Sequence, residues 1–195
     1  MLSPAEIRNR YERVQAEVGP NVTIVAATKY VALGEMALLI EAGITTVGEN
    51  RAQDLEAKHA VYGDAFTWHF IGALQSNKAK VVNARCDLVH SVDTDSTARR
   101  LTIPMLIQVN IADEQTKSGI APADLTAYLN YDVRGLSTMP PAAATADESR
   151  TWFRALRELA HSHNLTELSM GTTQDYAVAA QEGATYIRVG STLFR

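Results

Sequence analysis

Features that would crosslink, anchor or unfold the chain are scarce in this sequence. Its 195 residues contain one cysteine, Cys86, so no disulfide can form within the chain. No apolar run approaches the roughly 20 residues that a membrane-spanning helix needs. The first residues, MLSPAEIRNRYERV, have the pattern of a polar amphipathic helix rather than that of a signal sequence. We therefore expect a cytoplasmic protein that does not bind a membrane.

Charge of one sign is scarce as well. The 18 basic and 22 acidic side chains give a formal net charge of -4, and no run of like charge offers a surface for nucleic acid. Metal-ligand spacing is also missing, because His161 and His163 are two residues apart on a helical segment and face different sides of it. The partners that fit best are small molecules, with no nucleic acid and no metal.

Apolar residues, by contrast, are plentiful and regularly placed. They make up 46% of a chain with only 6 prolines and 11 glycines, which is enough for a compact core. Short runs rich in β-branched residues alternate with segments of helical period, the rhythm of repeated βα units. Strands are predicted at 22–28, 45–48, 68–72, 88–92, 104–110, 133–138, 167–170 and 186–190.

Eight such strands are the number required by a closed (β/α)8 barrel, the TIM-type α/β fold. Helical patterns lie at 32–42, 51–60, 75–84, 94–101, 122–130, 146–163 and 173–182, with one extra helix at the N-terminus. We expect one domain over residues 1–195, with an open, doubly wound parallel sheet as the alternative. In either fold, reactive residues gather at the carboxyl ends of the strands.

Lys29 is the first candidate, at the end of the apolar run TIVAATKYV. Strand alternation places it on the same face as Val25 and Ala27, so its amine is predicted to point into the barrel mouth. An apolar, enclosed site favours the neutral amine, which attacks a carbonyl to give a Schiff base. The alternative is an ordinary lysine whose head group reaches water at a strand end.

Two loops near the C-terminus form a candidate phosphate site. In LSMGTTQD a predicted strand passes through Gly171 into a helix whose first turn would carry Thr172 and Thr173, and the next strand ends in RVGST, with Gly190 and Ser191. Free amides, hydroxyls and a helix dipole bind monoester phosphates, and the loops after strands seven and eight are the usual site in barrels.

Arg188 would lie on the inward face of the last strand, where a buried guanidinium needs an acceptor. Two roles are open for it. One is an ion pair with a carboxylate such as Glu49 or Asp175, and the other is a hydrogen bond to an acceptor nitrogen on a planar ligand.

An ordered set of motifs spans nearly the whole chain: VAATKYV, VGENRAQD, WHFIGALQSNKAK, HSVD, LIQVNIADEQTKSGI, RGLSTMP and LSMGTTQDYAVAAQEGATYIRVGSTLF. In this order they resemble the YggS/PROSC family of pyridoxal 5′-phosphate-binding proteins. The resemblance implies a barrel similar to the N-terminal domain of alanine racemase (fold type III of these proteins) without the racemase β-domain. It also implies that pyridoxal phosphate is held as an internal aldimine.

The resemblance also assigns residues. Lys29 matches the Schiff-base lysine, and Arg188 matches the arginine that faces the pyridine nitrogen. The remaining positions that it implies for cofactor binding are Asn50, Ser91, Asn110, Ser169, Gly171, Thr173, Gly190 and Ser191. Thr172 and Thr173 replace the methionine and serine that are usual in the phosphate loop. Segments 100–103, 131–132 and 141–145 are shorter than is usual, so we expect truncated outer helices after strands four, five and six.

The implied role is homeostasis of vitamin B6 and of amino and keto acids, with pyridoxal-phosphate-dependent apoenzymes and free amino acids as further partners. A monomer is expected rather than an obligate oligomer. An arginine opposite the pyridine nitrogen weakens the ring as an electron sink, which disfavours robust turnover. Two alternatives stay open: an amino acid racemase or related enzyme using the same cofactor, and an aldolase-type barrel that acts on a sugar phosphate through Lys29.

Overall fold

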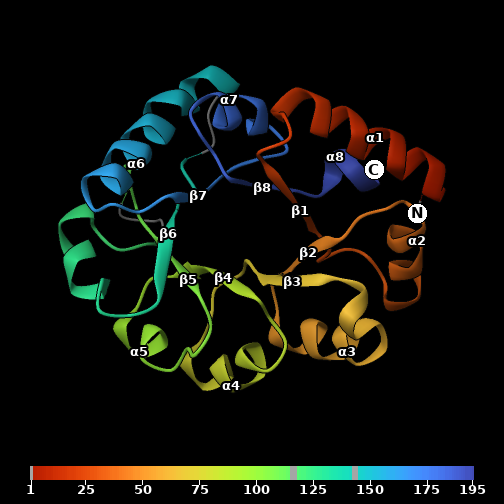
Figure 1. Ribbon diagram of the computed structural model, residues 1–195, viewed down its shortest axis with the longest axis horizontal. Helices are drawn as coiled ribbons and strands as arrows, with labels where there is room; N and C mark the ends of the chain where they lie inside the picture. The colour runs from red at the N-terminus through yellow and green to blue at the C-terminus, as the bar shows by residue number, and fades with distance from the viewer. Residues whose placement is uncertain (1, 115–117, 142–144) are drawn as a thin grey trace.

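Eight parallel strands close into a barrel in the computed structural model, which describes residues 2–114, 118–141 and 145–195. Each strand pairs with the next, and β8 pairs with β1 to complete the ring (Figure 1). The strands are β1 (Thr23–Ala27), β2 (Thr46–Glu49), β3 (Thr67–Phe70), β4 (Leu88–Val92), β5 (Met105–Gln108), β6 (Val133–Ser137), β7 (Glu167–Thr172) and β8 (Tyr186–Val189). Closure confirms the predicted (β/α)8 architecture over the open sheet.

Helices surround the ring on its outside (Figure 1). They are α1 (Pro4–Val18), α2 (Met36–Glu41), α3 (Ala52–Tyr62), α4 (Ala79–Asn83), α5 (Asp95–Ala98), α6 (Arg150–Ser162), α7 (Tyr176–Gln181) and α8 (Ser191–Phe194), with 3-10 turns η1 (Leu33–Glu35), η2 (Gly63–Ala65), η3 (Ser76–Lys78), η4 (Pro122–Tyr128) and η5 (Ala146–Ser149). The extra helix α1 contacts α2, α7 and α8 and so covers the seam where β8 meets β1. In the described part of the chain, no helix is long and apolar enough to cross a membrane.

The expected truncation of the outer helices is confirmed at two of three places. After β4, α5 spans only Asp95–Ala98, and after β5 the connection carries the 3-10 segment Pro122–Tyr128 instead of an α-helix. After β6, however, α6 runs over Arg150–Ser162 and buries Phe153 and Leu156. The expectation there was wrong because the long amphipathic period of 146–163 is enough to make a full helix, whatever the length of the loop before it.

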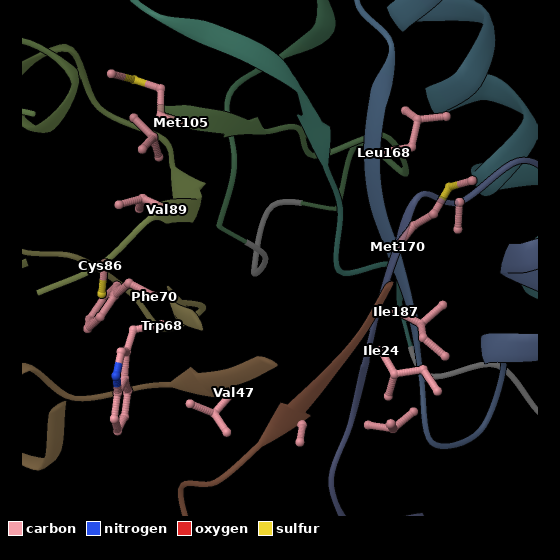
Figure 2. Packing of buried hydrophobic residues seen from close by; sticks show 14 of the residues in the cluster. Ile24, Val47, Trp68, Phe70, Cys86, Val89, Met105, Leu168, Met170 and Ile187 are labelled. Atoms are coloured by element: carbon pink, nitrogen blue, oxygen red, sulfur yellow. The ribbon is translucent and has the colours of Figure 1, made fainter. Parts of the chain in front are cut away.

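An apolar shell fills the space between the strands and the helices. Alternation sends Ile24 and Ala26 of β1 outward into this shell, where both are buried. Figure 2 shows part of it, from Val47 and Trp68 around to Met170 and Ile187. Dense apolar packing on this side fixes the register of every strand and therefore the positions at which the strands end.

The inside of the barrel, in contrast, holds polar side chains. His90 on β4 bonds through Nδ1 to Ser169 Oγ on β7 at 2.7 Å and through Nε2 to His69 Nδ1 on β3 at 2.9 Å. Because β4 and β7 are not neighbours in the ring, their contact crosses the barrel interior. Tyr186 packs its ring against both imidazoles, and the side chains of His69, His90 and Ser169 are all buried.

Candidate functional site

A cavity of about 470 Å³ opens at the carboxyl ends of the strands. Its wall is made by the residues that follow β1, β2, β3, β6, β7 and β8, together with the strand residues Ala27, Thr172 and Arg188. Six of the ten residues predicted for a site lie on this wall: Lys29, Asn50, Thr173, Arg188, Gly190 and Ser191. A volume of this size suits a small organic ligand.

Lys29 lies two residues beyond the end of β1 and lines the cavity. Its Nζ is 4.9 Å from the centroid of the Tyr30 ring, within range of a cation–π contact. The residue is exposed, although the sequence predicted an apolar and enclosed setting. That expectation was wrong because Ala26 packs in the outer shell and Ala27 ends the strand at the cavity wall, whereas Lys29 itself stands on the open loop above them.

A buried ion pair between Lys58 and Glu49 binds the backbone carbonyl of Thr28, the residue before Lys29. Lys58 Nζ of α3 donates to Glu49 Oε1 at 2.6 Å and to the carbonyl of Thr28 at 2.8 Å. Thr28 Oγ1 donates to the same carboxylate at 2.5 Å. Glu49 is therefore engaged on the outer side of β2, which excludes it as the ion-pair partner that was considered for Arg188.

Arg188 is buried at the base of the cavity and keeps one unsatisfied donor. Its Nη2 donates to the Thr138 carbonyl at 2.7 Å and contacts Met139 Sδ at 3.0 Å. Its Nε is buried and has no acceptor among the described residues. Burial lowers the pKa of the guanidinium to about 10, and the attraction of Asp175 opposes this shift, so the group stays charged at neutral pH.

The two hydroxyl-bearing loops meet as predicted. Ser191 Oγ lies 3.2 Å from Thr173 Oγ1, and both residues line the cavity next to Gly190. Gly171 has a φ of +88°, and a Cβ there would come within 2.5 Å of Ala179 Cβ, so a glycine is needed for α7 to pack on β7. The two hydroxyls therefore lie together on the cavity wall, and their use as an anion site stays a prediction.

The start of the following helix differs from the prediction. Thr172 ends β7, and α7 begins only at Tyr176, not at Thr173. Asp175 accounts for the shift, because its Oδ1 accepts hydrogen bonds from the Thr172 amide at 2.7 Å and from Thr172 Oγ1 at 3.2 Å. The Thr172 amide is therefore not free for an anion, contrary to the sequence-based expectation for this loop.

Three other predicted side chains are engaged within the protein. Ser91 Oγ donates to the Gly72 carbonyl. Asn110 exchanges hydrogen bonds with the backbone of Glu114, and Ser169 is bonded to His90 inside the barrel. These three residues and Gly171 are not part of the cavity wall, so a role for them in binding a ligand stays a prediction.

Sequence reasoning also missed residues that line the cavity. Tyr30, Glu35 and Ile71 are among them. Only Tyr30 carried a signal, since it directly follows Lys29 at the strand end.

The predicted residue Asn50 has a buried Oδ1 atom that accepts no hydrogen bond in the described part of the chain. Two orphaned polar atoms on one wall, an N–H of Arg188 and an oxygen of Asn50, are what a polar ligand would satisfy.

Known proteins with the same sequence pattern support this reading of the site. A pyridoxal phosphate homeostasis protein of Synechocystis is 35% identical, with 100% of this chain and 98% of that protein covered. A protein of the same name from Pseudomonas aeruginosa is 39% identical over 78% of this chain and 75% of its own length. The solved structure of PipY from Synechococcus elongatus with PLP bound is 34% identical, with a TM-score of 0.86 and coverage of 97% of this chain and 100% of that one.

No protein-family model matches the chain. The relatives nevertheless exceed 30% identity over most of both sequences, and the barrel agrees with the PipY structure along nearly its full length. Several of the motifs that carry the resemblance, among them those that contain Lys29, Thr173 and Arg188, are brought by the fold to one cavity. The chain therefore belongs to the family of pyridoxal phosphate homeostasis proteins.

Proposed function

We propose that this chain binds pyridoxal 5′-phosphate in the cavity at the barrel mouth and serves vitamin B6 homeostasis in the cytoplasm. The observation that carries the proposal is the buried Nε of Arg188, which has no acceptor within residues 2–114, 118–141 and 145–195; Arg188 lines the same cavity as Lys29. A buried N–H without an acceptor is costly, and a ring nitrogen with a lone pair would satisfy it.

Each part of the cofactor has a matching group on the wall. Lys29 supplies the primary amine that would hold the cofactor's aldehyde covalently as a Schiff base. The Thr173 and Ser191 hydroxyls, 3.2 Å apart, would hold the phosphate, and Arg188 would donate to the pyridine nitrogen. PipY, which is 34% identical to this chain, has been solved with this cofactor bound, and this likeness supports the assignment.

The chemistry of the wall favours storage and delivery over turnover. Pyridoxal phosphate supplies an aldehyde and, when its ring nitrogen is protonated, a sink for electrons from a bound amino acid. Arg188 is charged and buried, so it opposes placing a second positive charge on that nitrogen. We infer that the single domain of residues 1–195 holds the cofactor and passes it to apoenzymes, with free amino acids as ligands that help release it.

Borohydride trapping tests the site. The purified chain is incubated with pyridoxal phosphate, reduced, digested and mapped, and its visible absorption is recorded before reduction. We expect a visible band and a label on Lys29. A label on any other lysine would refute the site.

A second measurement separates storage from catalysis. The loaded protein is incubated with L-alanine and other L-amino acids, and the D-form is measured against free cofactor at equal concentration. We expect no excess over free cofactor. Turnover well above that level would favour the racemase alternative, and absence of any bound cofactor would favour the aldolase-type alternative.

A further inference from the structure

An acidic side chain occupies the loop that would hold the phosphate. We propose that Asp175 weakens the hold of this loop on a phosphate monoester and thereby sets how readily the ligand is released. The inference rests on the proposed function and adds to it a residue that limits affinity. The observation behind it is that Asp175 accepts hydrogen bonds from Thr172, a residue that lines the cavity, and adds a negative charge beside it.

The geometry of the turn shows how the donors are used. Asp175 Oδ1 accepts from both the amide and the hydroxyl of Thr172, at 2.7 and 3.2 Å, and the Asp175 amide donates back to the Thr172 carbonyl at 3.1 Å. Thr172 lines the cavity next to Thr173. Two donors that could serve an anion are therefore satisfied internally, and the hydroxyls of Thr173 and Ser191 remain as a smaller set.

The charge acts in the same direction. Asp175 is half-buried and its Oδ1 lies 3.2 Å from Thr172 Oγ1, so its negative charge would be close to an anion held at the neighbouring Thr173. Like charges at this range repel, and the repulsion doubles for a dianion.

This effect is specific to the phosphate end of a ligand. Lys29 and Arg188 contact other parts of a planar aldehyde, and Asp175 forms no hydrogen bond with either among the described residues. A ligand with the same ring but no phosphate should therefore not respond to the charge of Asp175. Pyridoxal, which lacks only the phosphate, is the matched probe.

Asp175→Asn is the test, because an asparagine keeps an oxygen for both Thr172 donors and removes only the charge. We expect its Kd for pyridoxal phosphate to fall about tenfold and release to an apoenzyme to slow by a similar factor, while the Kd for pyridoxal stays unchanged. Asp124→Asn, an exposed acid in η4 between β5 and β6, makes the same change in net charge and should leave both constants unchanged.

The outcomes are distinguishable. If the unaltered chain binds no pyridoxal phosphate, the proposed function fails. If it binds, the inference about Asp175 is overturned by either of two results. Asp175→Asn could bind pyridoxal phosphate as weakly as the unaltered chain or more weakly, or its gain in affinity could be the same for pyridoxal as for pyridoxal phosphate. Asp175→Ser, which keeps a short acceptor for the Thr172 amide, is a second neutral variant, and it should also tighten phosphate binding if charge is the cause.

Discussion

Two cations line the same cavity but lie in very different surroundings. Lys29 is exposed on a loop, next to the ring of Tyr30, while Arg188 is 7% exposed and bonded to the Thr138 carbonyl. Burial costs the arginine part of its preference for the charged form. The difference indicates a division of labour, with a fixed donor at the base of the cavity and a reactive amine that reaches ligands from solvent.

The largest expected effect comes from the exposed side. Lys29→Arg keeps the positive charge and removes the nucleophilic amine, so we expect complete loss of the borohydride-trapped label. Because Lys29 makes few contacts, the free energy of unfolding in urea should change by less than about 0.5 kcal/mol. Lys80→Arg on α4 is the matched control and should retain full labelling. Residual label in Lys29→Arg would show that a second lysine forms the bond.

The next effect concerns the buried side and the histidines there. Burial lowers the pKa of His69 to about 4. Burial also holds the pKa of His90 well below its usual range, and the repulsion that a protonated His90 would meet from a protonated His69 and from Arg188 acts in the same direction. The interior therefore contains Arg188 as its charged group while both imidazoles stay neutral. As pH falls, the histidines of the unfolded chain take up protons before those of the folded chain. The stability that depends on the neutral imidazoles is therefore fully present above about pH 6.5 and is lost between that pH and about pH 4.

We expect this loss to reach about 3 kcal/mol for His69, from its shift of roughly 2.5 units. His69→Gln removes the titrating group, so its stability should depend less steeply on pH over this window than that of the unaltered chain. Urea denaturation at pH 7 and pH 4.5 measures the difference, with the exposed His161→Gln as control. Equal slopes for all three proteins would contradict a buried, neutral His69.

The same contrast explains what could be predicted from the sequence. The barrel follows from eight apolar runs, and the strand 88–92 was predicted with its observed bounds. Strand ends then place Lys29, Thr173, Arg188 and Ser191 near one another, because all parallel strands end on the same side.

Contacts across the barrel could not be predicted in this way. The bond of His90 on β4 to Ser169 on β7 depends on the stagger of non-adjacent strands, which one sequence does not encode in any local pattern. The exposure of Lys29 depends on the path of its loop, and the late start of α7 depends on one side chain, Asp175, that competes with the helix for the Thr172 amide. Ser169 was assigned to a cofactor site for the same reason: its position in a motif says nothing of what faces it.

The smaller of the two stability effects expected on the buried side tests why Arg188 is buried at all. A shift of its pKa from 12.5 to about 10 corresponds to a cost of about 3 kcal/mol for the charged form, only partly offset by two contacts of Nη2. Methionine fills a similar volume without a charge, so Arg188→Met should raise the free energy of unfolding of the cofactor-free chain by about 1 kcal/mol.

The same variant should bind pyridoxal phosphate about tenfold more weakly, because it lacks the Nε donor. Calorimetry without cofactor and absorbance titration with it measure the two changes separately. A loss of stability would show that the Thr138 bond outweighs desolvation, and an unchanged affinity would show that Nε does not contact the ligand. A gain in stability together with a loss of affinity identifies a side chain that is kept for binding at the expense of folding.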